Sequence, residues 1–203
     1  TVDPNSLERV EIIYGSSSVG YGSDALGGVV HYYTKTPKIN NAKKLRNFFS
    51  STFNSSRQSV VHHFNSEASF NKSAILTSFT FSKFGNILMG KNRQHGFQNW
   101  GLINEYSSNS SSLYYESPSK NNNPNVQKNS EYRQIDILQK IVFTLPKEKQ
   151  LLINLQFSNS SNIPRFDKLN EMINNNLRFA EWNYGPQKRL LISPQLKIFP
   201  KKK

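Results

Sequence analysis

Apolar side chains alternate with polar ones along several stretches of this chain, most clearly between residues 150 and 158. There Leu151, Ile153, Leu155 and Phe157 occupy every second position. Because successive side chains of a β-strand point to opposite faces, this period predicts a strand with one apolar face and one mostly polar face. The same pattern predicts five more strands, at 46–54, 59–70, 73–84, 131–145 and 189–199.

The predicted connections between these strands differ in length at the two ends of an up-and-down sheet. One end has short turns at 71–72 and 146–149, whereas the other has two very long segments, 85–130 and 159–188. Compact soluble domains rarely carry such long excursions without secondary structure, but outer-membrane barrels combine short periplasmic turns with long external loops. The asymmetry favours an all-β transmembrane barrel, and a soluble β-sandwich, which also uses alternating strands, is the alternative.

Composition narrows the classes of function. The lack of cysteine excludes disulfides, a thiol nucleophile and metal sites built on Cys, and no apolar run reaches the roughly 18 residues of a transmembrane helix. Aromatic residues make up 12% of the chain, and their rings suit membrane interfaces. The formal net charge of +13 favours an anionic partner, so the alternative function is a soluble basic β-domain that binds nucleic acid.

The first 37 residues differ from the rest because a glycine-rich run separates two short predicted strands, 10–14 and 29–34. The glycine spacing approaches two nucleotide-binding motifs, but the residues that would hold phosphate, magnesium or ribose are missing. Glycine permits tight turns and positive φ, which suits a chain that folds back in a confined space. The glycines of this run that suit such turns are Gly15, Gly20, Gly22, Gly27 and Gly28.

The run LERVEIIYG at 7–15, followed by GYGSDALGGVV at 20–30, resembles the end of the plug domain of TonB-dependent outer-membrane receptors. Order, spacing and residue types agree, although Tyr14 stands where the family usually has Arg. In that family, charged residues of this element lie against the barrel wall and help to hold the plug. The resemblance implies this plug–barrel contact for Glu8, Arg9 and Glu11.

The resemblance also implies an architecture: a fragment of a plugged transmembrane antiparallel β-barrel. It comprises the C-terminal part of the plug domain at 1–37, a hinge at 38–45 and about six barrel strands over 46–203, with external loops at 85–130 and 159–188. Two stretches, 151–169 and 177–191, are similar to barrel segments of the haemoglobin- or haem-type subgroup of these receptors.

The activity implied by the resemblance is energy-coupled uptake of a scarce ligand across the outer membrane of a Gram-negative bacterium. The ligand is an iron complex, haem or a haem protein, and the partners are outer-membrane lipid and the inner-membrane TonB protein, which engages a segment upstream of this chain. No cofactor, nucleic acid or resident metal is expected. No catalytic arrangement of side chains stands out, so no enzyme activity is expected either.

Candidate ligand-binding residues lie in and beside the two long loops. Aromatic rings there can stack on a flat ligand or pack the loop over the barrel mouth, and cations can contact an anionic ligand or face solvent. These candidates are Trp100, Tyr106, Tyr114, Tyr115, Arg165, Lys188 and Arg189. Four histidines, His31, His62, His63 and His95, are either haem contacts or ordinary polar surface, and the two adjacent ones must face opposite ways on a strand.

Overall fold

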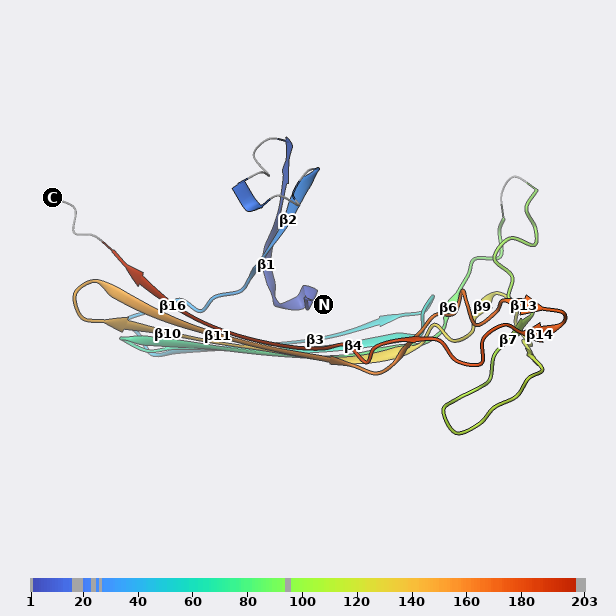
Figure 1. The fold of residues 1–203 in the computed structure, drawn as a ribbon. Coiled ribbons are helices and arrows are strands. Elements are labelled where there is room, and N and C mark those ends of the chain that lie inside the picture. The colour runs from blue at the N-terminus through green and yellow to red at the C-terminus, as the bar shows by residue number, and fades with distance from the viewer. Residues whose placement is uncertain (1, 16–19, 23–24, 26, 94–95, 200–203) are drawn as a thin grey trace.

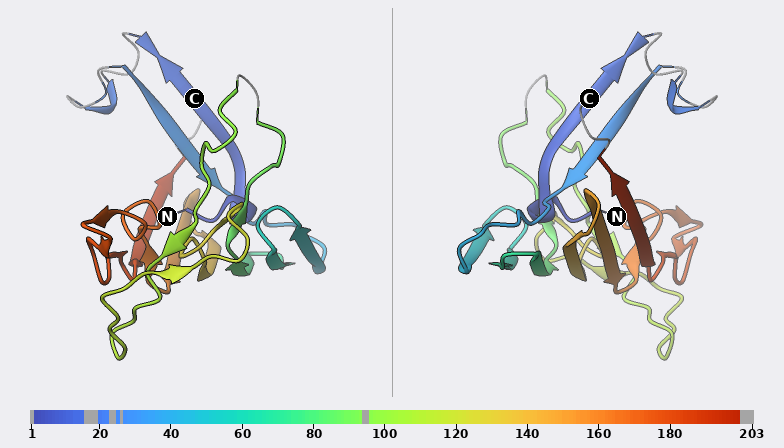
Figure 2. Two further views of the ribbon diagram at one scale, coloured as in Figure 1. Left: turned by 90° about the vertical axis from the view of Figure 1, so that its right-hand side faces the viewer. Right: turned by 90° about the vertical axis from the view of Figure 1, so that its left-hand side faces the viewer.

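The computed structural model describes residues 2–15, 20–22, 25, 27–93 and 96–199. Its two main parts are a two-stranded antiparallel hairpin near the N-terminus and a six-stranded antiparallel sheet (Figure 1). The sheet is bowed, and the hairpin stands up from its concave face, as the views in Figure 2 also show. The described elements are η1 (Pro4–Ser6), β1 (Leu7–Tyr14), β2 (Gly28–Thr34), β3 (Lys44–Asn54), β4 (Ser59–Ser69), β5 (Ser73–Phe84), β6 (Ile87–Leu88), β7 (Glu105–Tyr106), β8 (Ser119–Lys120), β9 (Val126–Gln127), β10 (Tyr132–Leu145), β11 (Lys149–Ser160), β12 (Ile163–Pro164), β13 (Met172–Ile173), β14 (Asn176–Leu177), β15 (Asn183–Tyr184) and β16 (Lys188–Ile198).

The six strands predicted from alternation are the six long strands of the sheet, and their ends differ from the prediction by at most two residues. The sheet order is β16-β11-β10-β5-β4-β3, so each long strand pairs with the long strand that precedes or follows it in the chain. This up-and-down antiparallel order confirms the arrangement that the connection lengths indicate. The two strands predicted around the glycine run are β1 and β2, which pair from Leu7↔Thr34 to Tyr14↔Gly28.

The two ends of the sheet carry connections of different length, as predicted. Short turns at 70–72 and 146–148 lie at one end, called here the turn end, and the segments 85–131 and 161–187 lie at the other, the loop end (Figure 1). The prediction that 85–130 lacks structure of its own is wrong, because β6 pairs with β9 and β7 pairs with β8. These ladders are two residues long, which is too short to leave a periodic signal in the sequence.

One face of the sheet is apolar and exposed. The strand register aligns large apolar side chains into rows that cross all six strands, and the exposed fractions of Phe79 and Phe157 are both 40%. One such row consists of Phe49, Phe64, Phe79, Ile137, Phe157 and Leu190. Soluble monomers rarely expose a contiguous apolar surface that crosses a whole sheet.

Beneath the hairpin the opposite face is buried, and its polar groups lie among a few apolar side chains such as Leu138. Ser78 and Thr80 are each 1% exposed, Asp136 is 7% exposed and Lys140 is 5% exposed. A soluble sandwich would bury the apolar face instead, and no second long-stranded sheet covers that face within the described part of the chain. Apolar residues facing out and polar residues facing in are the pattern of a transmembrane barrel wall. No helix among the described residues is long and apolar enough to span a membrane.

Candidate functional site

The hairpin is attached to the polar face through a short helical turn, η1, that precedes β1. Asp3 caps this turn: its Oδ1 accepts a hydrogen bond from the backbone N of Asn5 at 3.0 Å, and Pro4 occupies the first helical position. The second carboxylate oxygen, Oδ2, accepts from the hydroxyl of Ser6 at 2.6 Å and from the hydroxyl of Thr80 in β5 at 2.7 Å. One buried carboxylate therefore caps the turn and holds it against the barrel wall.

Two further contacts extend this attachment along the wall. Ser6 and Ser78 place their hydroxyl oxygens 3.0 Å apart, and His63 Nδ1 lies 2.8 Å from Thr80 Oγ1. Because Thr80 donates its proton to Asp3, its oxygen is free to accept, so His63 carries its proton on Nδ1. The resulting chain of hydrogen bonds runs from β4 through β5 into the hairpin. We call Asp3, Ser6, His63, Ser78 and Thr80 the docking cluster.

A second anchor holds the other strand of the hairpin. Lys140 in β10 donates from Nζ to the backbone oxygen of Thr34 at 3.0 Å and to the hydroxyl of Thr36 at 2.9 Å. Nearby, Lys35 donates from Nζ to the backbone oxygen of Asn5 at 2.7 Å, which joins the two ends of the hairpin. A buried lysine without a carboxylate is costly unless its ammonium is hydrogen-bonded, and these contacts supply the partners.

The charged residues expected to hold the plug occupy different places. Arg9 and Glu11 pair with each other, with Arg9 Nε 2.7 Å from Glu11 Oε1, and the Arg9 guanidinium lies 3.7 Å from the centre of the Tyr33 ring. Hydrogen bonds from Arg9 and then Tyr33 lower the pKa of Glu11, so this carboxyl stays ionised. Glu8 lines a cavity between the hairpin and the sheet. Contact of these three residues with the wall stays a prediction.

The glycines of the hairpin have different conformations. Gly15, Gly22 and Gly28 have φ of +69°, +128° and +151°, whereas Gly20 and Gly27 do not lie in this range. At Gly28 a Cβ would come within 2.8 Å of the backbone oxygen of Ile13, so a side chain there would clash with the paired strand. Glycine is thus required where β2 begins, both by backbone angle and by space.

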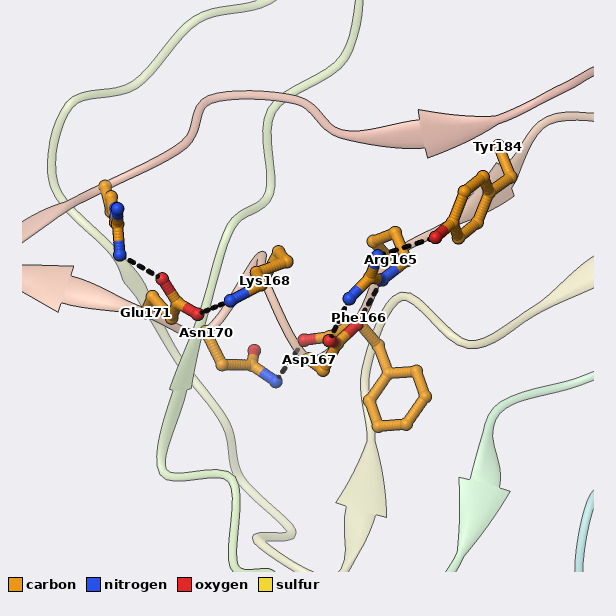
Figure 3. Close-up of polar contacts among 8 residues, drawn as sticks. Arg165, Phe166, Asp167, Lys168, Asn170, Glu171 and Tyr184 are labelled. Atoms are coloured by element: carbon orange, nitrogen blue, oxygen red, sulfur yellow. Dashed lines mark hydrogen bonds and ion pairs between the residues drawn. The ribbon is translucent and has the colours of Figure 1, made fainter.

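A second polar network lies at the loop end, in the segment that follows β11 (Figure 3). Arg165 contacts both oxygens of Asp167, at 2.8 and 2.5 Å, and donates to the hydroxyl of Tyr184 at 2.7 Å. The short β12–β15 ladder brings these residues together by pairing Ile163 with Tyr184. Hydrogen bonding raises the pKa of Arg165 and lowers that of Asp167, so the pair stays charged.

Arg165 also lines a cavity of about 270 Å³ on the loop end, called here the loop-end cavity. Arg57, from the β3–β4 turn, lines it from the other side, with its guanidinium 4.7 Å from the Phe84 ring centre and 5.3 Å from that of Tyr132. Tyr184 completes an arrangement of two guanidinium groups beside aromatic rings. Arg57 was missed from the sequence because it lies in a short turn with no motif around it.

The other predicted ligand-binding residues do not gather in this cavity. Trp100 lines a separate cavity with Arg93 and Phe97, and Lys188 lines another with Arg133 and Pro186. The remaining ones are dispersed: Tyr106 lies 5.5 Å from Lys128 Nζ, Tyr114 and Tyr115 are exposed, and Arg189 donates to Gln156 on the polar face.

The histidines do not form a common site either. His31 stacks on Tyr33 in the hairpin with ring centres 4.1 Å apart, and His62 is exposed on the apolar face. His63, 2% exposed, belongs to the docking cluster, so the prediction that His62 and His63 face opposite ways is confirmed. His95 lies outside the described residues. Among the described residues, no group of three metal-binding side chains comes together.

The loop-end network gives a pH prediction. Asp167 is held by Arg165, and Glu171 by Lys168 and Arg178, so the pKa of each carboxyl lies below its ordinary value of 3.8 or 4.5. A lowered carboxyl pKa stabilises the fold above the unfolded pKa, and this contribution is lost as pH falls through the folded pKa. We expect hydrogen exchange of segment 161–187, corrected for intrinsic rates, to stay constant from about pH 7 to 5 and to rise only below about pH 4.

The Arg165→Gln variant tests the assignment of this pH effect. It removes the cation that holds Asp167, so exchange should be faster already at neutral pH and should vary less with acid. A transition centred near pH 6 in the unchanged protein would instead point to histidine and contradict the carboxylate explanation.

The geometry defines a class of protein, a transmembrane barrel wall with a hairpin docked on its lumenal face. Comparison with protein families agrees, because residues 1–29 match the family model described as TonB-dependent Receptor Plug Domain. No curated protein matched the chain. The family match supports a TonB-dependent receptor plug in the N-terminal segment, and it does not specify a ligand or a haem-type subgroup.

Proposed function

We propose that this chain is part of a TonB-dependent transporter that takes up a scarce ligand across the outer membrane of a Gram-negative bacterium. One observation carries the proposal: the segment that matches a plug domain is hydrogen-bonded, through Asp3 and Ser6, to the polar face of a sheet whose other face is apolar. Energy coupling would come from the inner-membrane TonB protein, acting on a segment upstream of the hairpin. The proposal includes no catalytic step.

The loop-end cavity is the place where we propose that the ligand first binds. Guanidinium groups next to aromatic rings suit a planar ligand with anionic groups, because the rings stack and the cations pair with carboxylates. Haem, free or presented by a haem protein, meets this description, and an iron complex with carboxylate groups shares its negative charge. Trp100 and the tyrosines of the first long loop would then contribute from the surrounding loops, rather than from one preformed pocket.

The nucleic-acid alternative fits the described surface less well. Binding along a strand of nucleic acid needs a continuous basic face with exposed rings. Here the hairpin covers the middle of the polar face, and the buried cation Lys140 beneath it is already bonded to Thr34 and Thr36. The other face is apolar. We therefore propose no nucleic-acid partner.

Uptake by intact cells that produce the full receptor tests the proposal. Radioactive haemin and ferric citrate serve as probes, and entry of one of them should require both the receptor and TonB. Deleting residues 105–128 should weaken binding of that probe about tenfold or more, or about 1.4 kcal/mol. The barrel should remain heat-resistant in detergent, because none of the six long strands uses that segment for its ladder.

Heat resistance in detergent reports whether the barrel is intact, so it serves as the control for this deletion. Unchanged binding and uptake in the deletion variant would move the ligand site away from the first long loop. Uptake of neither probe, with or without TonB, would contradict the proposed transport of iron complexes or haem.

A further inference from the structure

A cavity of about 430 Å³ lies at the turn end of the sheet, between the base of the hairpin and the polar face. We call it the turn-end cavity. Its lining comes from the hairpin, from the linker at 35–43 and from β3, β4 and β5. The loop-end cavity lies beyond the opposite end of the same strands, so the two cavities are on either side of the docked hairpin.

The charged groups around the turn-end cavity are mostly cationic. Lys35, Lys38, Lys44 and Arg46 line it against two carboxylates, Glu8 and Glu67, which leaves a formal charge of +2. Lysine and arginine this close together repel one another unless anions lie between them. The sequence shows only a basic stretch near the hinge, and the fold places several of its side chains around one cavity.

Two of these cations have no acidic partner of their own. Among the described residues, no carboxylate oxygen lies within 4 Å of the side-chain nitrogens of Lys44 or Arg46. Glu67 accepts instead from the backbone N of Lys38 at 3.1 Å. Asn65 also lines the cavity, and its buried Oδ1 has no hydrogen-bond partner in the described part of the chain. The two cations therefore remain available to an anion, and the Asn65 oxygen can accept from a hydroxyl group of the same molecule.

We infer that the turn-end cavity is a second binding site, for a small anionic ligand with carboxylate or phosphate groups. The inference rests on the proposed transport function for its role, which is to receive the ligand after it has passed the hairpin. Lys44 and Arg46 would pair with the anionic groups, and Arg46 can do so through two parallel N–H donors. Lipid phosphate is not the expected source, because these side chains lie on the polar face and not on the lipid-facing one.

Calorimetric titration of the purified full receptor with citrate and with inorganic phosphate tests the site. The Lys44→Gln/Arg46→Gln variant should bind citrate about tenfold more weakly or not at all, which corresponds to about 1.4 kcal/mol or more. The matched control is Lys72→Gln/Lys147→Gln, which removes two exposed charges from the short turns at the same end and should bind as the unchanged protein does. Glu67→Gln removes a negative charge from the lining and should tighten citrate binding.

Equal citrate affinity in the cavity variant and the control variant would overturn the inference. The inference would also be overturned if the cavity variant bound anionic phospholipid vesicles more weakly while its affinity for citrate was unchanged. That result would assign the cations to a lipid headgroup. A separate arm tests the transport role: the cavity variant should retain binding of the external probe to cells but should take it up more slowly. If no probe is taken up by the unchanged receptor, the proposed function fails while the citrate result still stands.

Discussion

Replacing Ile153 or Ile192 with lysine should lower the free energy of unfolding of the full barrel by about 2 to 4 kcal/mol. Both side chains lie on the apolar face: Ile153 pairs with Ile141 on one side and Pro194 on the other, and Ile192 pairs with Leu155. A lysine near the bilayer midplane must desolvate its ammonium or distort the lipid around it. Denaturant unfolding of the receptor in lipid vesicles, followed by tryptophan fluorescence, measures this change.

The matched control is Ser193→Lys, one residue along the same strand as Ile192. Ser193 pairs with Asn154 and faces the polar side, where a charged side chain can reach water. Its cost should be well below that of the apolar-face variants, since lumenal positions tolerate charge. A large and equal loss at Ile192 and Ser193 would mean that the strand register is wrong.

A site-specific probe separates lipid exposure from simple burial, since any buried apolar position resists lysine. The chain has no cysteine, so a fluorophore can be attached to single cysteines introduced at 153, 154, 155 or 156. Acyl-chain quenchers should reduce fluorescence at 153 and 155 and should have little effect at 154 and 156. Quenching at all four positions, or at none, would contradict a lipid-facing strand.

The second large effect is expected at the docking cluster. Thr80→Val keeps the shape of the side chain but removes a hydroxyl that donates to Asp3 and accepts from His63. A buried carboxylate then loses one donor and a buried ring nitrogen loses its acceptor, which costs about 1 to 3 kcal/mol. Hydrogen exchange should show the loss as roughly five- to hundredfold weaker protection at the hairpin base, notably at the Lys35 N–H that bonds Ser6.

Thr77→Val provides the control on the same strand. Its hydroxyl donates to Gln139 on the opposite, apolar face and makes no contact with the hairpin. The hairpin base should therefore exchange as in the unchanged protein, and β10 and β11 should remain protected in both variants. Equal loss of protection in the two variants would show that the wall, and not the docking cluster, determines the exchange.

The long strands were predictable because large apolar side chains recur at every second position along most of their length, although residues such as Leu138 and Gln139 break the pattern. The pattern also placed Lys140 on the polar face. Its partner Thr34 was not predictable, because it lies more than a hundred residues earlier and no local pattern links the two.

The candidate site was predicted only in part. Of the residues proposed to bind ligand, only Arg165 lines the loop-end cavity; its partner across the cavity, Arg57, comes from a turn. The docking cluster was missed because serine and threonine are common throughout this chain. The sequence pattern of short polar residues on a lumenal face is the same whether or not a hairpin is docked there. Contacts of this kind, between segments distant in the sequence, are set by the tertiary structure and leave no periodic pattern or motif in the sequence.

The order of the two hairpin anchors along the chain has a mechanical consequence. Tension applied from the N-terminal side reaches the bonds of Asp3 first and those of Ser6 next, so they rupture one after another rather than sharing the load. The rupture force is then set by one or two hydrogen bonds at a time. The Lys140 anchor at Thr34 is joined to this segment across the base of the hairpin, because the Lys35 N–H bonds Ser6 and Leu7 pairs with Thr34, so it takes up the load once both have parted. A weak, steady pull can thus release the helical turn from the wall while the Lys140 anchor keeps the hairpin tethered.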